Sequence, residues 1–228
     1  MGRLSYFCEM ASVPYSFSFL DQNLLLLPEK AIFWEEEQIL IVADIHLGKV
    51  GHFRKAGIAI PKKMEQDDLA ELSDLIHRYR PKTVLLLGDL FHSELNNDWD
   101  WLVLWRSLFI DLRMILVLGN HDILNKALYY DLRFELFEHF DAGPFRFTHE
   151  PVEKQFLANT DFYTISGHIH PGVVLEGAGR QMLTLPCFHF GKRQAILPAF
   201  GKFTGKVSMK NSKEDQIFAV LQDKIIGF

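Results

Sequence analysis

The sequence contains few cysteines and no long apolar run, and each absence excludes a class of protein. Only two cysteines, Cys8 and Cys187, occur in 228 residues. This number indicates no disulfide framework and favours a reducing compartment. The longest apolar runs, such as NLLLLP, are far shorter than the roughly 20 residues that span a bilayer. Because the first residues also lack the ordered regions of a secretory signal, we predict a soluble, cytoplasmic protein that does not act at a membrane.

An excess of basic residues is also missing. Lys and Arg number 24 against 29 Asp and Glu, which gives a formal net charge of −5. This balance argues against a broad basic face that wraps nucleic acid, although a local patch can still contact a few phosphates. Hydrophobic residues make up 48% of the chain, enough for a sizeable core. We expect one domain over residues 1–228, with residues 1–23 set apart as an N-terminal extension to which the sequence assigns no structure.

Three apolar runs dominate the first half of the chain: QILIVADIH (38–46), KTVLLLGD (82–89) and RMILVLGNHD (113–122). They lack polar alternation, which is typical of strands covered on both faces. Helix-period apolar residues at 69–79 and 101–109 separate them, so the order predicts parallel crossovers in an α/β fold. From about residue 134, short segments bounded by Gly, Pro or charge predict mostly antiparallel strands.

Polar side chains follow the predicted strands at their carboxyl ends, where open α/β sheets bind ligands. Two carboxylates, one amide and four imidazoles are candidate metal ligands: Asp44, His46, Asp89, Asn120, His149, His168 and His170. Mixed oxygen and imidazole ligation suits manganese, iron, cobalt or zinc, whereas magnesium prefers oxygen almost alone. The set therefore predicts a centre for divalent transition metals.

Each of these motifs has a simpler explanation when it is taken alone. Asp44 and His46 could belong to a strand-end turn, and the GNHD sequence is also typical of turns. Their joint occurrence at successive strand ends favours the metal centre instead. Asp89 follows the central strand of the three, so it is the natural bridge between two cations about 3.5–4 Å apart.

The spacing of His168 and His170 raises a separate question. Residues two apart point to the same face of an extended strand. A bend after Gly167 would let the two rings diverge to different metals.

In this order, the motifs DIH, GD, GNHD, a single His and GHIH resemble the signature of the calcineurin-like metallophosphoesterases. The resemblance implies an α/β fold, specifically a four-layer α/β/β/α sandwich with mixed sheets and a dinuclear metal centre at the sheet edge. It assigns Asp44, His46, Asp89 and His170 to one metal. It assigns Asp89, Asn120, His149 and His168 to the other.

A narrower likeness extends outside the metal motifs. The stretches LPEKAIFW, DIHLGKVGHFRKAGIAIP, THEP and ILPAFGKFTG are similar to the bacterial ligase-associated DNA damage response endonuclease group. These are manganese-dependent phosphodiesterases. The likeness implies two Mn ions (with Fe, Co or Zn as alternatives), single-stranded DNA as a substrate in DNA repair, and a ligase or helicase as partner.

The expected reaction is hydrolysis of a phosphodiester by attack of a metal-activated hydroxide. His121 is the candidate general acid for the leaving group, and Asp122 would orient and charge its imidazole. Lys49 and Arg54, in the segment after the first metal motif, are candidates for binding flanking phosphates, although a solvated loop face would explain them equally. His92 is a third candidate for lining the substrate pocket.

Two other functions are compatible with parts of the sequence. The same centre could act on a small nucleotide, a cyclic phosphodiester or a pyrophosphate, and cleavage of single-stranded DNA would separate this hypothesis from the nuclease. A non-catalytic scaffold for protein binding would have no need of all seven ligands and His121, so it is disfavoured.

Overall fold

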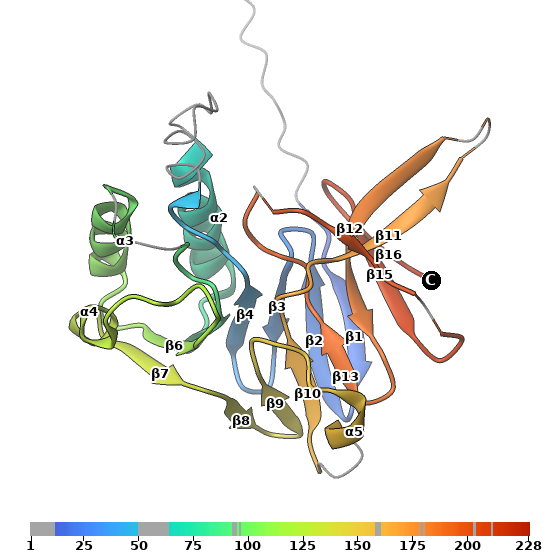
Figure 1. Cartoon of the computed structure of the whole chain (residues 1–228), viewed down its shortest axis with the longest axis horizontal. Helices are drawn as coiled ribbons and strands as arrows, with labels where there is room; N and C mark the ends of the chain where they lie inside the picture. Colours follow the sequence, from blue (N-terminus) through green and yellow to red (C-terminus); the bar gives the residue numbers. More distant parts are fainter. Residues whose placement is uncertain are drawn as a thin grey trace, which may run out of the picture.

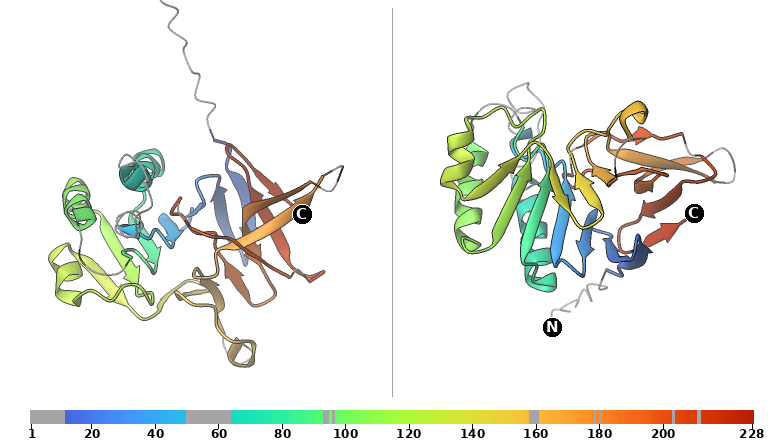
Figure 2. Two further views of the ribbon diagram at one scale, coloured as in Figure 1. Left: turned by 45° about the horizontal axis from the view of Figure 1, so that its top comes forward. Right: turned by 90° about the horizontal axis from the view of Figure 1, so that it is seen from below.

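The computed structural model describes residues 12–49, 64–92, 95, 97–157, 161–177, 179, 181–202, 204–210 and 212–228. Two β-sheets pack face to face, and helices cover the outer face of the first sheet (Figures 1 and 2). Within the described residues, no helix is long and apolar enough to cross a membrane. This layered architecture agrees with the sandwich that the family resemblance implies.

The first sheet has seven strands in sequence order and brings the three apolar runs together as neighbours. Its first four strands are antiparallel and its last four are parallel, so the predicted parallel crossovers are present. The strands are β1 (Tyr15–Phe19), β2 (Gln22–Leu27), β3 (Ala31–Trp34), β4 (Ile39–Ala43), β5 (Thr83–Leu87), β6 (Arg113–Val117) and β7 (Phe134–Phe137).

The register of the parallel strands brings their carboxyl ends to the same edge of the sheet. Ala43 pairs with Leu87, and Leu87 pairs with Val117, at the last residues of β4, β5 and β6. The residues that follow these strands therefore leave the sheet at one edge. In β4, Ile41 packs toward the second sheet and Val42 toward the helices. Burial on both faces explains why polar alternation is missing from these runs.

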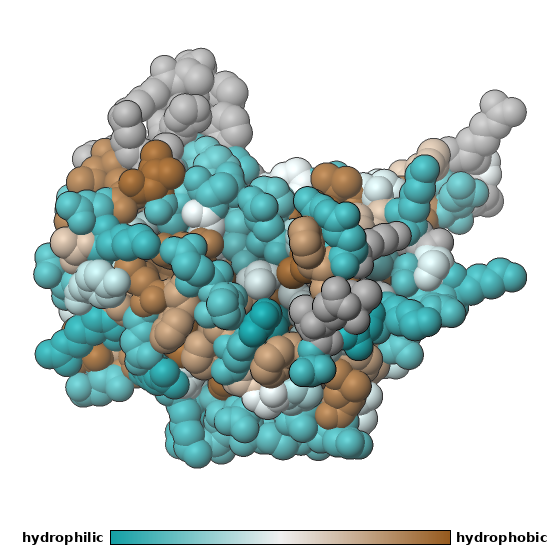
Figure 3. Space-filling view, turned by 60° about the horizontal axis from the view of Figure 1, so that its bottom comes forward, coloured by the Kyte–Doolittle hydropathy of each residue, from teal (hydrophilic) through white to brown (hydrophobic). Residues whose placement is uncertain are grey.

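Three helices, α2 (Met64–Tyr79), α3 (Asn97–Leu108) and α4 (Lys126–Asp131), lie on the outer side of the first sheet (Figure 1). In α2, apolar residues three or four apart, such as Leu69, Leu72 and Ile76, are buried in the core beneath the helix. Helix α3 begins earlier than the periodicity predicts, because its first turn is acidic rather than apolar. Figure 3 shows brown hydrophobic residues between teal hydrophilic ones on the helical side of the molecule.

The second sheet is mixed, as the family resemblance implies. Strand β10 runs parallel to its neighbours β9 and β13, whereas most other pairs are antiparallel. Among the described residues, the short helix α5 (Lys154–Leu157) is the only one that accompanies this sheet. The strands are β8 (Phe140–Ala142), β9 (Phe145–Phe147), β10 (Tyr163–Ser166), β11 (Pro171–Glu176), β12 (Met182–Phe190), β13 (Gln194–Ile196), β14 (Val207–Ser208), β15 (Gln216–Val220) and β16 (Ile225–Gly227).

The expected boundary of an N-terminal extension at residue 23 needs correction. Residues 15–19 form the edge strand β1, which pairs with β2. Phe17 and Phe19 alternate along β1 and contact rings of the second sheet, with Phe17 lying 4.9 Å from Phe190 and Phe19 lying 4.7 Å from Tyr163 between ring centroids. The period-two aromatic pattern of YSFSF was the available signal for this strand. Residues 1–11 lie outside the described residues.

Candidate metal centre

The polar residues predicted as ligands meet where the strands of both sheets end. Asp44 and His46 follow β4, Asp89 follows β5, and Asn120 follows β6. The second sheet contributes the remaining imidazoles through His149 after β9, and through His168 and His170 after β10.

Two groups of side chains could each hold a metal ion. Asp44, His46 and His170 form one, and Asp89, His149 and His168 form the other, with the ligand atoms of each group within 4.8 Å of one another. The Oδ1 atom of Asn120 lies 3.0 Å from Nε2 of His149 and so adjoins the second group.

Asp89 lies between the two groups. Its Oδ2 atom is 3.7 Å from Nε2 of His46, and its Oδ1 atom is 3.5 Å from Nε2 of His149. The structure therefore brings together all seven predicted ligands, with Asp89 at the position expected of a bridge. The ligand role of each residue stays a prediction.

The backbone at these positions adopts an unusual conformation. The φ angles of Asp44, His46, Asp89, His168 and His170 are 54°, 54°, 50°, 68° and 54°. Left-handed backbone is uncommon for residues other than glycine, and it clusters at functional sites, where the surrounding structure enforces it. This bend also answers the question about the GHIH motif, because His168 and His170 join different groups.

Two glycines allow neighbouring loops to approach the carboxylates. A Cβ atom at Gly167 would lie 2.5 Å from Oδ2 of Asp44, and one at Gly119 would lie 2.3 Å from Oδ1 of Asp89. Asp44 Oδ2 instead accepts a hydrogen bond of 2.8 Å from the backbone N–H of His168. Any larger residue at these positions would push a candidate ligand out of place.

The first group contains buried polar atoms without hydrogen-bond partners. In the described part of the chain, Asp44 Oδ1, His46 Nε2 and His170 Nε2 have none. Burial lowers the pKa of His46 to about 2, and the positive charge of Lys49 adds to this effect. The imidazole is therefore neutral, which is the form that binds metals. A buried carboxylate beside the neutral His46 imidazole is costly unless a cation compensates it, so this group fits a divalent ion.

The second group is oriented by the surrounding backbone. Nδ1 of His149 lies 3.0 Å from the carbonyl oxygen of Leu87, to which it can donate its proton. This hydrogen bond leaves Nε2 as the lone-pair nitrogen that faces Asn120, Asp89 and His168. Such support from outside the ligand set is typical of metal-binding histidines.

His121 lies beside the candidate ligand His46, and its role as a proton donor stays a prediction. Its ring centroid is 5.5 Å from that of His46 and 4.5 Å from that of His92, and its backbone N–H donates to Asp89 Oδ1 at 2.9 Å. The partly exposed His121 ring can therefore meet a substrate bound beside the metal ligands. His92 borders the same space through its contacts with His46 and His121.

The expected contact from Asp122 to His121 is absent, and this prediction requires correction. The Asp122 carboxylate accepts hydrogen bonds from the backbone N–H groups of Gly119 and Phe91 and from the hydroxyl of Tyr129. Burial raises its pKa to about 6. The turn folds the side chain back under the loop, because Asp122 N–H itself bonds to the Gly119 carbonyl at 3.2 Å. Asp122 therefore shapes the loop that carries Asn120 and His121.

Comparison with known proteins identifies the family of the chain. Residues 38–217 match the family model described as calcineurin-like phosphoesterase. The chain belongs to the calcineurin-like phosphoesterase family. A structure of the nuclease MPE from Pseudomonas putida matches with a TM-score of 0.77 and 28% sequence identity, covering 91% of this chain and 97% of that chain. The phosphoesterase Yfce from E. coli matches with a TM-score of 0.42 and 14% identity, covering 83% and 97%. No curated protein sequence matches the chain.

The family model and the nuclease structure confirm the predicted family and fold. The chain is a phosphoesterase whose two groups of candidate ligands suit two divalent metals. The nuclease relative supports the predicted class of phosphodiester hydrolase and agrees with the narrower likeness found in the sequence.

The predicted substrate contacts of the phosphoesterase are only partly described. Burial lowers the pKa of Lys49, while the negative charges of Asp89 and Asp44 oppose this change, so its ammonium lies within electrostatic reach of both carboxylates. The positive charge of Lys49 would also attract a phosphate bound at the centre. Arg54 lies outside the described residues.

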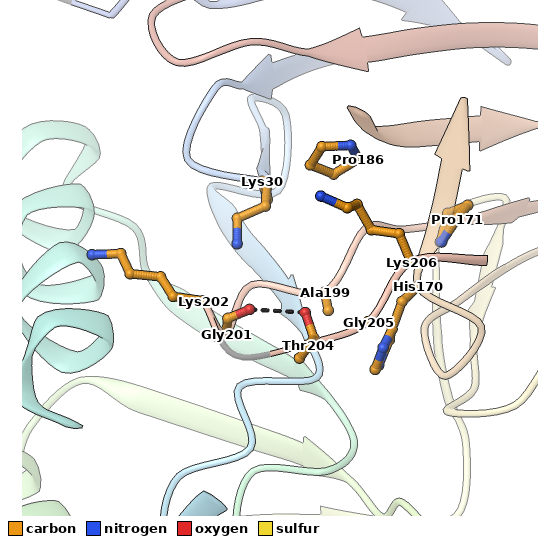
Figure 4. A pocket seen from close by; sticks show the side chains of 10 residues that line it. All are labelled: Lys30, His170, Pro171, Pro186, Ala199, Gly201, Lys202, Thr204, Gly205 and Lys206. Carbon is orange, nitrogen blue, oxygen red and sulfur yellow. Dashed lines mark hydrogen bonds between the residues drawn. The ribbon is translucent and has the colours of Figure 1, made fainter. Parts of the chain in front are cut away.

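Sequence reasoning missed a pocket that adjoins the metal centre of the phosphoesterase. His170 lines it together with the cationic residues Lys30, Lys202 and Lys206 (Figure 4). The segments LPEKAIFW and ILPAFGKFTG contain Lys30 and Lys202 and were noted only for their family likeness. Their convergence depends on the packing of the two sheets, so no motif could reveal it.

Proposed function

We propose that this phosphoesterase is a manganese-dependent nuclease that hydrolyses phosphodiester bonds in DNA. One observation carries the proposal: two groups of candidate ligands meet at Asp89, in a chain that resembles a bacterial nuclease over almost its whole length. A phosphodiester fits this arrangement, because each of its two nonbridging oxygens could interact with one of two cations.

Seven side chains would hold the two ions: Asp44, His46, Asp89, Asn120, His149, His168 and His170. When bound, the ions supply positive charge for the phosphoryl oxygens and a source of hydroxide near neutral pH. His121 donates a proton to the leaving alkoxide from the partly exposed side of the centre. Lys49 adds a positive charge that attracts the phosphate.

The choice of manganese rests on the likeness to the manganese-dependent endonuclease group, and the donor set is compatible with it. Four imidazoles beside two carboxylates disfavour magnesium, which prefers oxygen ligands. Iron, cobalt and zinc accept the same donors and are the alternatives to be compared.

The proposal extends to single-stranded DNA as substrate, to a role in DNA repair in the cytoplasm, and to a ligase or helicase as partner. Support comes from the likeness of LPEKAIFW, THEP and ILPAFGKFTG to the repair endonuclease group. The low number of cysteines fits a reducing compartment.

Hydrolysis of defined substrates with defined metals tests the proposal. The metal-free protein is loaded separately with Mn, Mg, Zn or Co and assayed on single-stranded DNA, duplex DNA and a cyclic dinucleotide. The variant Asp89→Asn, purified identically, controls for contaminating nucleases. We expect Mn-dependent cleavage of single-stranded DNA that is lost in the variant.

Two results would contradict the proposal. Hydrolysis of the cyclic dinucleotide without cleavage of DNA would indicate a small-substrate phosphodiesterase instead. DNA cleavage that persists in Asp89→Asn would mean that the activity does not come from this centre.

A further inference from the structure

The pocket beside His170 is a distinct space with its own charge. It opens to solvent and shares His170 with the first group of candidate ligands. Its described walls come from the turn between β2 and β3, from residues 199–202 and 204–206, and from β11 and β12. Among the described residues that line it are three lysines and no carboxylate.

Two lysines face this space from opposite sides. Figure 4 shows Lys30 and Lys206 on separate segments, with the Lys206 ammonium extending toward the side of Lys30 and Pro186. Burial lowers the pKa of Lys30, and the positive charges of Lys202 and Lys206 lower it further, against the attraction of Asp68 and Glu71. The two ammonium groups therefore repel each other across the pocket.

The lysines differ in how far their charges are already compensated. Lys30 donates a hydrogen bond to the backbone carbonyl of Phe200. Lys202 extends away from the pocket in Figure 4 and pairs with Glu71, with Nζ and Oε2 3.1 Å apart. Within the described part of the chain, no carboxylate lies within ion-pair distance of the exposed Lys206. Lys206 is thus available to an external anion.

We propose that this pocket binds a phosphate of the DNA strand next to the phosphodiester that is hydrolysed. The inference rests on the proposed nuclease function. A strand whose scissile phosphate lies among the metal ligands must continue past the edge of the centre, and His170 belongs to both the centre and the pocket. Ammonium groups bind phosphate oxygens, and an anion between Lys30 and Lys206 removes their mutual repulsion.

The test compares substrates with and without neighbouring phosphates. Bis(4-nitrophenyl) phosphate contains a single phosphate, whereas a single-stranded oligonucleotide has phosphates on both sides of the cleaved bond. The quantity measured is the ratio of kcat/KM for the oligonucleotide to kcat/KM for the small diester, in the Mn-loaded protein. Because both substrates use the metal centre, the ratio isolates the effect of flanking phosphates.

Lys206→Gln should lower this ratio about tenfold, mainly through a higher KM for the oligonucleotide, because one charge-assisted contact is lost. The slope of log kcat/KM against log salt should also become shallower. Lys210→Gln makes the same change of charge four residues away, outside the pocket lining, and should keep the ratio within twofold.

A second variant tests the pocket without removing a lysine. Gly205 lines it, and a Cβ atom there would meet no other atom within 4 Å. Gly205→Asp therefore adds a negative charge without a steric clash and should also lower the ratio.

The outcomes separate this inference from the nuclease proposal. If the wild-type protein cleaves both substrates and Lys206→Gln keeps the wild-type ratio, the pocket inference is wrong and the nuclease function stands. An equal fall for Lys206→Gln and Lys210→Gln would also overturn the pocket, because general charge would then explain the loss. If the wild-type protein hydrolyses only the small diester, the nuclease proposal fails and the strand-binding pocket fails with it.

Discussion

The metal centre and the lysine pocket both concentrate charge at the same edge of the molecule, but their charges have different surroundings. Asp44 and Asp89 are 0% and 2% exposed, whereas Lys206 is exposed. A buried carboxylate requires a permanent counter-charge, while an exposed ammonium is stabilised by water until an anion arrives. The centre is therefore suited to a resident cation and the pocket to a ligand that comes and goes.

The two regions also differ in the backbone elements that carry their residues. Candidate ligands follow parallel strands whose register is fixed by Ala43, Leu87 and Val117. Lys30 and Lys206 come from a turn and from the approach to the short strand β14. Rigid strands suit chemistry that needs fixed distances, and loops suit the recognition of a particular substrate.

The largest effect is expected at the residue shared by both ligand groups. Asp89→Asn should lower kcat/KM for every phosphoester by more than about 100-fold, because even residues outside a ligand set cost about 10–100-fold when they are replaced. Steady-state assays with Mn on bis(4-nitrophenyl) phosphate and DNA measure this effect. Asp74→Asn, at an exposed position of α2, is the matched control. A loss confined to DNA would show that Asp89 serves substrate binding and that the two regions are not distinct.

His121 should affect the chemical step in a way that depends on the leaving group. His121→Ala should lower kcat about 100-fold for an ester with an alkoxide leaving group and much less for one with 4-nitrophenolate, which departs without a proton. The exposed His139, replaced by Ala, is the control. Equal losses on both esters would exclude the general-acid role.

Metal addition should stabilise the centre and not depend on the pocket. Mn at about 1,000 times its Kd should raise the free energy of unfolding by about 4 kcal/mol per site. Because the buried ligand atoms of the first group have no hydrogen-bond partners, we expect a metal to bind them. His46→Ala should therefore lose part of this gain in stability, whereas Lys206→Gln should retain it. Denaturant unfolding with Mn and with a chelator measures both. An undiminished gain in His46→Ala would remove His46 from the ligand set.

The smallest effect is expected at Asp68, a buried carboxylate that is not a candidate metal ligand. It is 7% exposed, accepts a 3.3 Å hydrogen bond from the Lys202 backbone N–H, and has its pKa raised by burial to about 6, against the opposing charges of Lys30 and Lys202. A raised carboxyl pKa stabilises the fold below pH 3.8, and this contribution is lost as the pH rises through about 6.

Asp68→Asn should therefore increase stability at pH 7.5 by up to about 3 kcal/mol, with a smaller gain at pH 5. Urea unfolding at the two pH values measures the difference, with the exposed Asp74→Asn as control. A loss of stability at pH 7.5 would mean that attraction to Lys30 and Lys202 outweighs the cost of burial.

Periodicity and motifs were sufficient to predict the parallel strands β4 to β6, the helices between them and the set of candidate ligands. They were insufficient where a signal was short or had two interpretations. YSFSF is only five residues long, so the edge strand β1 was assigned to an extension. Asp122 was paired with His121 because the two are adjacent, yet the turn directs its carboxylate to Gly119 and Phe91.

By itself, the sequence determined which chemistry is available, because the kinds of ligand and their places after apolar strands are local properties of the chain. Only the tertiary structure decided where those groups lie in space: the distances that place His168 and His170 in separate ligand groups on either side of Asp89, and the meeting of Lys30 with Lys206 beside His170. The physical reason is that these contacts join segments far apart in the chain, and their distances depend on strand register and on the packing of one sheet against the other.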